Sequence, residues 1–139
     1  MQNIRIVFLG SPPLKQAVER FAANHYHNFD LIAASSNFAD LFMLLDVHLP
    51  QMLLLEGDRN WLQLAELIKK THSRYPRLKV LLLVNEVEID QILAFINIGV
   101  KGCLLVDPTF DGIEDAINLV YSGKLTLSAE ITQALLLSE

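Results

Sequence analysis

The feature that most constrains the fold is a regular alternation of short apolar runs with longer segments of helical periodicity. The apolar runs cover residues 4–9, 29–34, 52–55, 80–84 and 102–106. Each run is nearly continuous, which is typical of strands buried on both faces of a parallel sheet. Strands that alternate with helices form βαβ units. We therefore predict an α/β fold: a three-layer, doubly wound, five-stranded parallel sheet of flavodoxin-like topology, with strand order 2-1-3-4-5.

Helical spacing marks the segments between these runs. In the third segment, Trp61, Leu64, Ala65 and Ile68 recur at intervals of three and four, and the pattern stops before Pro76. Proline disfavours helical backbone at the residue that precedes it, which explains the stop. A short extra helix is expected at residues 129–137. No internal repeat, linker or low-complexity tract interrupts the pattern, so we expect a single domain over residues 1–139.

Charge and composition exclude several classes of protein. The chain carries 11 basic and 16 acidic residues, a net charge of −5. Binding nucleic acid needs a basic face that neutralises phosphates, so we expect this chain not to bind nucleic acid directly. A single cysteine, Cys103, excludes an intrachain disulfide and a cysteine-built metal site. No apolar run approaches the ~18 residues of a membrane span. We expect a cytoplasmic protein that does not contact the membrane.

Three stretches in the second half of the chain resemble one protein family. They are "KVLLLV" at residues 79–84, "INIGVKGCLLVD" at 96–107 and "AINLVYSGKLTLSAEI" at 116–131. With these stretches, the chain resembles the receiver domain of two-component response regulators, in the branch that carries a LuxR-type helix-turn-helix tail. The resemblance implies the regulatory domain of a transcription regulator. It also implies a C-terminal DNA-binding domain that residues 1–139 do not contain.

The phosphorylation chemistry of that family is not matched by the residues found here. Its members phosphorylate an aspartate at the end of the third strand and hold Mg²⁺ with it and an acidic pair after the first strand. A hydroxyl residue after the fourth strand and a lysine after the fifth contact the phosphoryl group. By the resemblance, these roles fall on Glu56, on Gly10 and Ser11, on Val84 and on Val106, respectively. Phosphoryl transfer depends on the metal and the cations. We therefore predict a degenerate site with no catalytic residue, no metal, no cofactor and no enzyme activity.

Glu56 has two interpretations. One is a phosphate mimic that fixes an active-like state, with a charge of about −1 against about −1.5 to −2 for a phosphate group. The other is an exposed or capping acid at a strand end, near the start of the next helix. The residues that would sense the charge are missing, and the sequence leaves both interpretations open.

The predicted function is that of a phosphorylation-independent pseudo-receiver, a signalling module that forms a homodimer. The helix at residues 89–98 is apolar nearly all round, which favours burial against a partner. We assign Leu93 to the side that faces the sheet and Phe95 to the outer edge. The expected switch and interface residues are Phe95, Ile98, Cys103, Leu119 and Tyr121. Two alternatives remain: a small-molecule sensor that uses the altered apolar pocket, and a stand-alone adaptor for another signalling protein.

Overall fold

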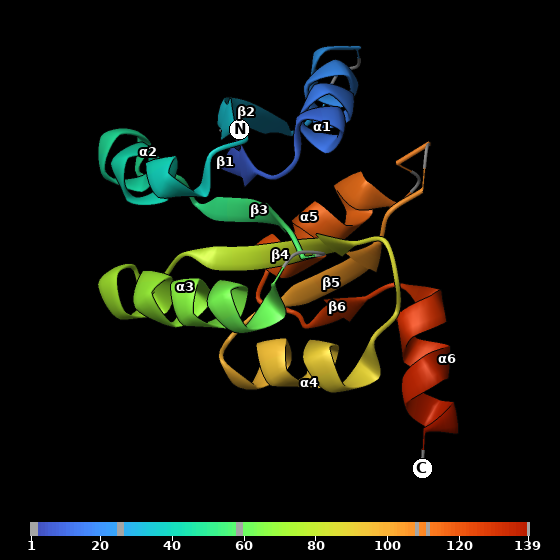
Figure 1. Cartoon of the computed structure of the whole chain (residues 1–139). Coiled ribbons are helices and arrows are strands. Elements are labelled where there is room, and N and C mark those ends of the chain that lie inside the picture. Colours follow the sequence, from blue (N-terminus) through green and yellow to red (C-terminus); the bar gives the residue numbers. More distant parts are fainter. Residues whose placement is uncertain (1–2, 25–26, 58–59, 108, 111, 139) are drawn as a thin grey trace.

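The computed structural model describes residues 3–24, 27–57, 60–107, 109–110 and 112–138. Within these residues, one parallel sheet is surrounded by helices (Figure 1). The strands are β1 (Ile4–Leu9), β2 (Phe29–Ser35), β3 (Met52–Glu56), β4 (Lys79–Val84), β5 (Gly102–Leu105) and β6 (Thr126–Leu127). The helices are α1 (Pro12–Asn24), the 3-10 helix η1 (Phe38–Asp40), α2 (Leu41–His48), α3 (Trp61–Arg74), α4 (Ile89–Asn97), α5 (Ile113–Tyr121) and α6 (Ala129–Leu137).

The sheet confirms the parallel, flavodoxin-like α/β fold and corrects its strand count. Its order is β2-β1-β3-β4-β5-β6, so the prediction of five strands ordered 2-1-3-4-5 is wrong by one edge strand. β6 pairs with β5 in parallel, and two hydrogen bonds flank the pair: Thr126 N donates to Lys101 O at 3.0 Å, and Ser128 N donates to Cys103 O at 3.1 Å. A strand of two residues is too short to leave a periodic signal in the sequence.

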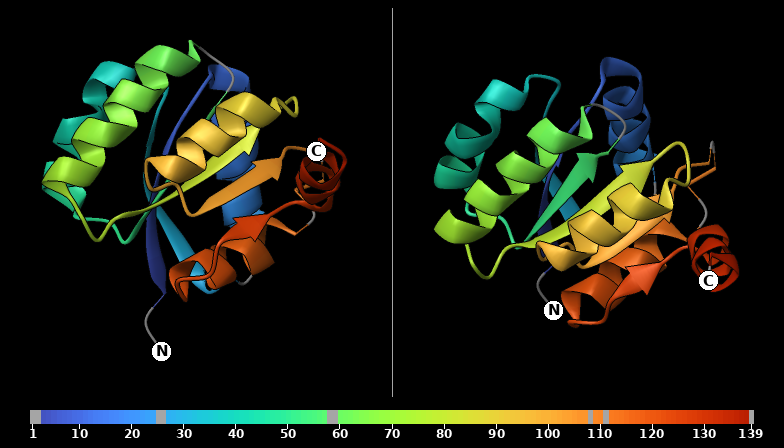
Figure 2. Two further views of the ribbon diagram at one scale, coloured as in Figure 1. Left: turned by 90° about the horizontal axis from the view of Figure 1, so that it is seen from below. Right: turned by 60° about the horizontal axis from the view of Figure 1, so that its bottom comes forward.

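The helices cover both faces of the sheet (Figure 2). A separate hydrophobic core lies between the sheet and the helices on each face. Along β1, Ile6 and Phe8 point to the core beneath α1 and α5, whereas Val7 and Leu9 point to the core beneath α2, α3 and α4. This alternation follows from the two-residue repeat of a strand. α6 adds its fully buried Ile131 to the second core, so the C-terminal helix is part of the domain.

The turn after α4 packs closely against α3, where Gly99 meets the side chain of His72. Gly99 has φ +110°, and a Cβ there would lie 2.9 Å from His72 Cε1, so this position favours glycine for both conformation and space. His72 Nδ1 lies 3.0 Å from Ile98 O. Burial lowers the pKa of His72 below its usual value. The hydrogen bond to Ile98 acts in the opposite direction, and the charge of Lys101 adds to the lowering.

Candidate functional site

The five positions that the resemblance singled out lie at one edge of the sheet, where the strands end. We call it the carboxyl edge; the strands begin at the opposite, amino edge. Gly10 and Ser11 follow β1, Glu56 ends β3, Val84 ends β4, and Val106 follows β5. Val106 N donates to Val84 O at 2.8 Å, so these two valines lie at the ends of paired strands. Ligands of open α/β sheets bind at this edge.

Glu56 is buried and hydrogen-bonded to the backbone. Its exposed fraction is 7%, and its Oε1 accepts the N–H of Ser11 at 2.6 Å. The prediction of an exposed acid is therefore wrong. Glu56 also does not cap the next helix: Asn60 caps α3 by accepting from Gln63 N at 3.3 Å, whereas Glu56 binds the turn that leads into α1. The N–H of the partly buried Ser11 gains a strong acceptor in this way.

Gly10 and Glu56 depend on each other sterically. A Cβ added at Gly10 would lie 2.9 Å from Glu56 Cβ, 3.1 Å from Glu56 Oε1 and 2.7 Å from Phe8 Cζ. The Glu56 side chain thus fills the space that a side chain at position 10 would need. Sequence reasoning treated the two positions separately. One signal could have linked them: at the ends of two adjacent strands, a glycine replaces an acid of the resembled family and a glutamate replaces its aspartate.

A cleft of about 450 Å³ opens beside Glu56 at the carboxyl edge. Its residues are Ser11, Pro13, Leu14, Ala17, Glu56, Asn85, Val106, Asp107 and Phe110. None of these lining residues is a lysine, arginine or histidine, so among the described residues of the lining a phosphoryl group would meet the carboxyl groups of Glu56 and Asp107 and no side-chain cation. α1 begins with Pro12 and Pro13, which carry no N–H to bind an anion.

Metal binding finds no more support at this edge. Among the described residues, no group of three or more histidine, cysteine, aspartate or glutamate side chains could hold a metal ion. Asp107, the other acid of the cleft, uses its Oδ1 to accept the N–H of Thr109 at 2.8 Å, as expected for a turn residue. The carboxyl edge therefore offers neither a phosphoryl cradle nor a divalent-cation site in the residues that the structure describes.

The expected interface needs correction at two residues. Phe95 is 2% exposed and packs edge-on against Trp61, with ring centroids 6.4 Å apart, so its placement on the outer edge is wrong. Leu93, assigned to the sheet side, is instead 42% exposed. Cys103 is 1% exposed and packs in the same core as Ile131 of α6, so it cannot be a contact residue on the surface. Helical periodicity finds an apolar stripe but leaves its rotation about the helix axis open.

The remaining three expected interface residues keep some or much of their surface. Ile98 is half-buried, and its carbonyl oxygen lies against His72. Leu119 and Tyr121, both on α5, are 40% and 41% exposed. These two are the members of the expected set that a partner could contact most directly.

Comparison with known proteins gives a fold and no closer relationship. No protein-family model matches the sequence, and no curated protein matches it. A LuxR-family two-component response regulator from Aurantimonas sp. SI85-9A1 is similar in structure, with a TM-score of 0.78, 15% identity and coverage of 95% of this chain and 94% of that one. The signal receiver domain of the putative response regulator NarL from Mycobacterium tuberculosis is also similar, with a TM-score of 0.75 and 21% identity. The match covers 89% of this chain and 100% of that one.

A longer structure is similar over the same region. The RcsB response regulator of Salmonella typhimurium gives a TM-score of 0.80 at 16% identity, and the match covers 97% of this chain and 66% of that one. Together with the sheet topology, these structures show that the chain has the receiver-domain fold of response regulators. The part of the chain that the structure describes contains no helix long and apolar enough to cross a membrane.

Proposed function

We propose that this chain is a receiver-type signalling domain that works without phosphorylation, as the regulatory part of a cytoplasmic transcription regulator. The observation that carries the proposal is the closed arrangement at the end of β3. Glu56 stands at the position of the phosphoacceptor and is engaged with the backbone of Ser11 at 2.6 Å. Its side chain also fills the space next to Gly10, where the resembled family has an acid. This arrangement leaves no room for the family's metal site.

Electrostatics supports the same conclusion. Transfer of a phosphoryl group to an acceptor depends on positioned cations, and removing one stabilising donor typically costs about 3–4 kcal/mol of barrier. Val84 and Val106 offer no donor at the positions of the family's hydroxyl and lysine. The cleft beside them is lined by carboxyl groups and apolar side chains. A site with these residues would repel the reactant rather than stabilise its transition state.

A structural role for Glu56 explains its geometry better than phosphate mimicry does. Mimicry requires side chains that move toward the charge. Val84 is buried at 4% exposure, and neither it nor Val106 has a polar atom to direct at Glu56. The contact that Glu56 does make, to Ser11 N, stabilises the turn before α1. We therefore expect the charge of Glu56 to matter for stability and little for signalling.

Signalling without phosphorylation needs another output, and we propose self-association through α5. Leu119 is 40% exposed in the last turn of this helix. One structurally similar protein is described as two RcsB dimers bound to two parallel DNAs, which supports a dimer for a domain of this fold. Paired regulators bind two half-sites, so a constitutive homodimer would suit a transcription regulator.

Sedimentation equilibrium over a hundredfold concentration range tests this proposal. We expect the same dimer with and without acetyl phosphate and Mg²⁺. Leu119→Glu should weaken the dimer about tenfold or more, because it places a charge in an apolar contact. Leu62→Glu, a matched control on α3 at 61% exposure, should leave it unchanged. A monomer throughout, or a dimer that appears only with acetyl phosphate, would contradict the proposal.

A further inference from the structure

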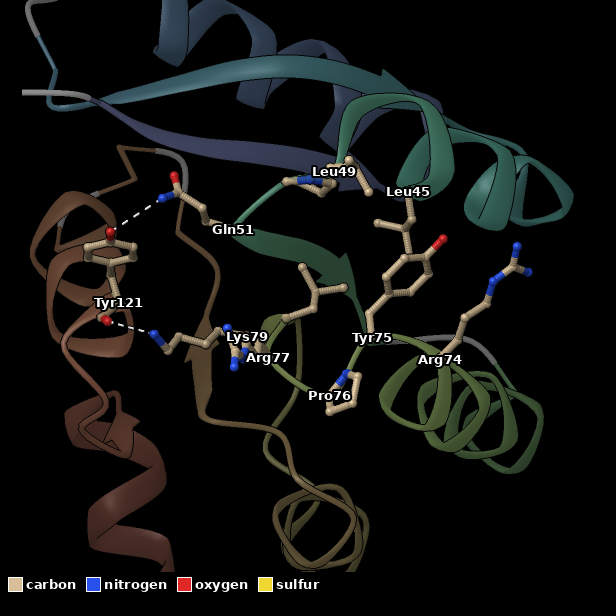
Figure 3. A pocket seen from close by; sticks show the side chains of 11 residues that line it. Leu45, Leu49, Gln51, Arg74, Tyr75, Pro76, Arg77, Lys79 and Tyr121 are labelled. Carbon is tan, nitrogen blue, oxygen red and sulfur yellow. Dashed lines mark hydrogen bonds between the residues drawn. The ribbon is translucent and has the colours of Figure 1, made fainter.

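A hollow larger than the cleft beside Glu56 lies at the amino edge of the sheet, which is the opposite edge from that cleft. Figure 3 shows the side chains that line it. It has a volume of about 710 Å³, within the range of roughly 300–1,000 Å³ usual for small-molecule sites. It opens between the C-terminal ends of α2, α3 and α5. We call it the amino-edge hollow; its residues are Leu45, Leu49, Pro50, Gln51, Arg74, Tyr75, Pro76, Arg77, Leu78, Lys79 and Tyr121.

Two cations of this hollow have donors to spare. Arg77 is exposed and forms no hydrogen bond or ion pair with a described residue. Lys79 Nζ donates to Tyr121 O at 2.8 Å, which uses one of the three N–H groups of the ammonium. The third cation, Arg74, is matched by Asp46, whose Oδ2 lies 2.6 Å from its guanidinium. The uncompensated charge of the hollow is therefore that of Arg77 and Lys79.

One wall of the hollow is held in place by hydrogen bonds. Gln51 Nε2 donates to the hydroxyl oxygen of Tyr121 at 3.3 Å, and Gln51 Oε1 accepts the N–H of Arg5 at 2.8 Å. Lys79 Nζ also lies 5.0 Å from the centroid of the Tyr121 ring. Since the Tyr121 hydroxyl already accepts a hydrogen bond, its own proton remains able to donate. A fixed wall of this kind lowers the entropy that a ligand would lose on binding.

The floor of the hollow is apolar and its lining carries no carboxyl group. Leu45 and Leu78 are fully buried or nearly so, at 0% and 6% exposure, and the Tyr75 ring stands beside Leu45 (Figure 3). The polar groups around this floor are mainly donors: Arg77, Lys79 and the hydroxyl of Tyr121. Donors without facing carboxyl groups favour an anion, and an apolar floor favours an apolar body attached to it.

We propose that the amino-edge hollow binds a small organic anion, such as an aromatic or branched aliphatic carboxylate. The guanidinium of Arg77 and the ammonium of Lys79 hold the carboxylate, and the apolar body lies on Leu78 and Tyr75. This site goes beyond the proposed function and is independent of it, since it lies at the opposite edge from Glu56. It would make the domain responsive to a ligand. A small-molecule sensor of this kind would use the amino edge and not the altered pocket at the carboxyl edge.

A titration followed by ¹H–¹⁵N NMR tests the proposal with naphthalene-2-carboxylate and its neutral analogue naphthalene-2-carboxamide. We expect saturable shifts at the backbone amides of Gln51, Lys79 and Tyr121. The carboxylate should bind about tenfold more tightly than the carboxamide, as the loss of a charge-assisted contact implies. Shifts that appear elsewhere, or that are absent, would overturn the proposal. Equal affinity for both probes would overturn its anionic part.

Two charge-reversal variants separate a specific site from general attraction. Arg77→Glu should weaken binding of naphthalene-2-carboxylate at least about tenfold. Arg20→Glu makes the same change in net charge on an exposed position of α1, and it should change the affinity by less than about twofold at physiological salt. Arg77→Gln, which removes the charge without reversing it, should fall between them. Equal losses in Arg77→Glu and Arg20→Glu would show that only net charge matters and would refute the site.

Discussion

The two edges of the sheet treat their polar groups in opposite ways. At the carboxyl edge, Glu56 is buried and bonded to Ser11 N, and its neighbour Gly10 has no space for a side chain. At the amino edge, Arg77 is exposed, and Lys79 keeps N–H groups free beside a hollow of about 710 Å³. At the carboxyl edge, where this fold usually binds its ligands, the buried acid is already bonded to the backbone. At the amino edge, cationic donors remain available beside the hollow.

This difference separates structural from functional polar groups. A buried acid whose oxygen is used by the backbone contributes to stability, and its removal should be felt throughout the domain. Exposed donors around an apolar floor contribute little to stability and are available to a ligand. We therefore expect substitutions at the carboxyl edge to change unfolding free energy and substitutions at the amino edge to change binding.

The largest effect is expected for Gly10→Asp, which restores the acid of the resembled family. The new side chain would overlap Phe8 and Glu56, so we expect a loss of about 3 kcal/mol or more in unfolding free energy, measured by urea denaturation. Adding Glu56→Asp, which withdraws the carboxyl group by one methylene, should restore about 1 kcal/mol.

Gly112→Asp provides the matched control for that substitution. Gly112 has φ +81°, but outside its chain neighbours no described residue lies within 4 Å of an added Cβ, so only conformational strain of about 1 kcal/mol is expected. If Gly10→Asp lowers the unfolding free energy no more than Gly112→Asp does, the close packing of Gly10 against Glu56 does not exclude an acid at position 10.

A smaller effect is expected for Glu56→Gln. The amide oxygen still accepts from Ser11 N, but a neutral hydrogen bond replaces a charged one, so stability should fall by about 1 kcal/mol. The sedimentation behaviour should stay the same. A large loss of dimer in Glu56→Gln would instead support the phosphate mimic.

Arg77→Gln at the amino edge should change the unfolding free energy by less than about 0.5 kcal/mol.

His72 should make the stability depend on pH in one direction. Its pKa is lowered in the folded state, chiefly by burial, so the unfolded chain binds more protons as the pH falls through the usual histidine value of 6.5. The stabilisation is complete above that value and decreases below it. Urea denaturation at several pH values should show this decrease, and His72→Gln should reduce it. An unchanged pH dependence in His72→Gln would show that other groups cause it.

The smallest effect concerns two tyrosines of the amino edge. The hydroxyl of Tyr75 is buried and has no hydrogen-bond partner among the described residues, whereas that of Tyr121 accepts from Gln51 Nε2. Tyr75→Phe should therefore be neutral or stabilise by up to about 1 kcal/mol, because it removes an unsatisfied polar group. Tyr121→Phe should destabilise by a few tenths of a kcal/mol. The reverse order would mean that the Tyr75 hydroxyl has a partner in solution.

The sequence predicted the layers of the fold because continuous apolar runs and helical spacing report burial directly. It missed β6, since two residues carry no period, and it misplaced Phe95, since a stripe does not specify which side faces the sheet. It placed the five carboxyl-edge positions at the ends of the strands. It could not show that the Glu56 side chain accepts a hydrogen bond from Ser11 N. The amino-edge hollow could not be predicted, because Gln51 and Arg77 come from two different connections and Tyr121 comes from the end of α5, and these segments meet only in the folded chain.

The central claim is that the carboxyl edge no longer accepts a phosphoryl group. The most direct measurement is intact mass after incubation with acetyl phosphate and Mg²⁺, on the wild-type chain and on Glu56→Asp, which restores the usual acceptor. We predict no phosphoryl adduct on either protein, because Val84 and Val106 provide no donor and Gly10 and Ser11 provide no carboxyl group for the metal. A stoichiometric, base-labile adduct at Glu56 of the wild-type chain would contradict the account.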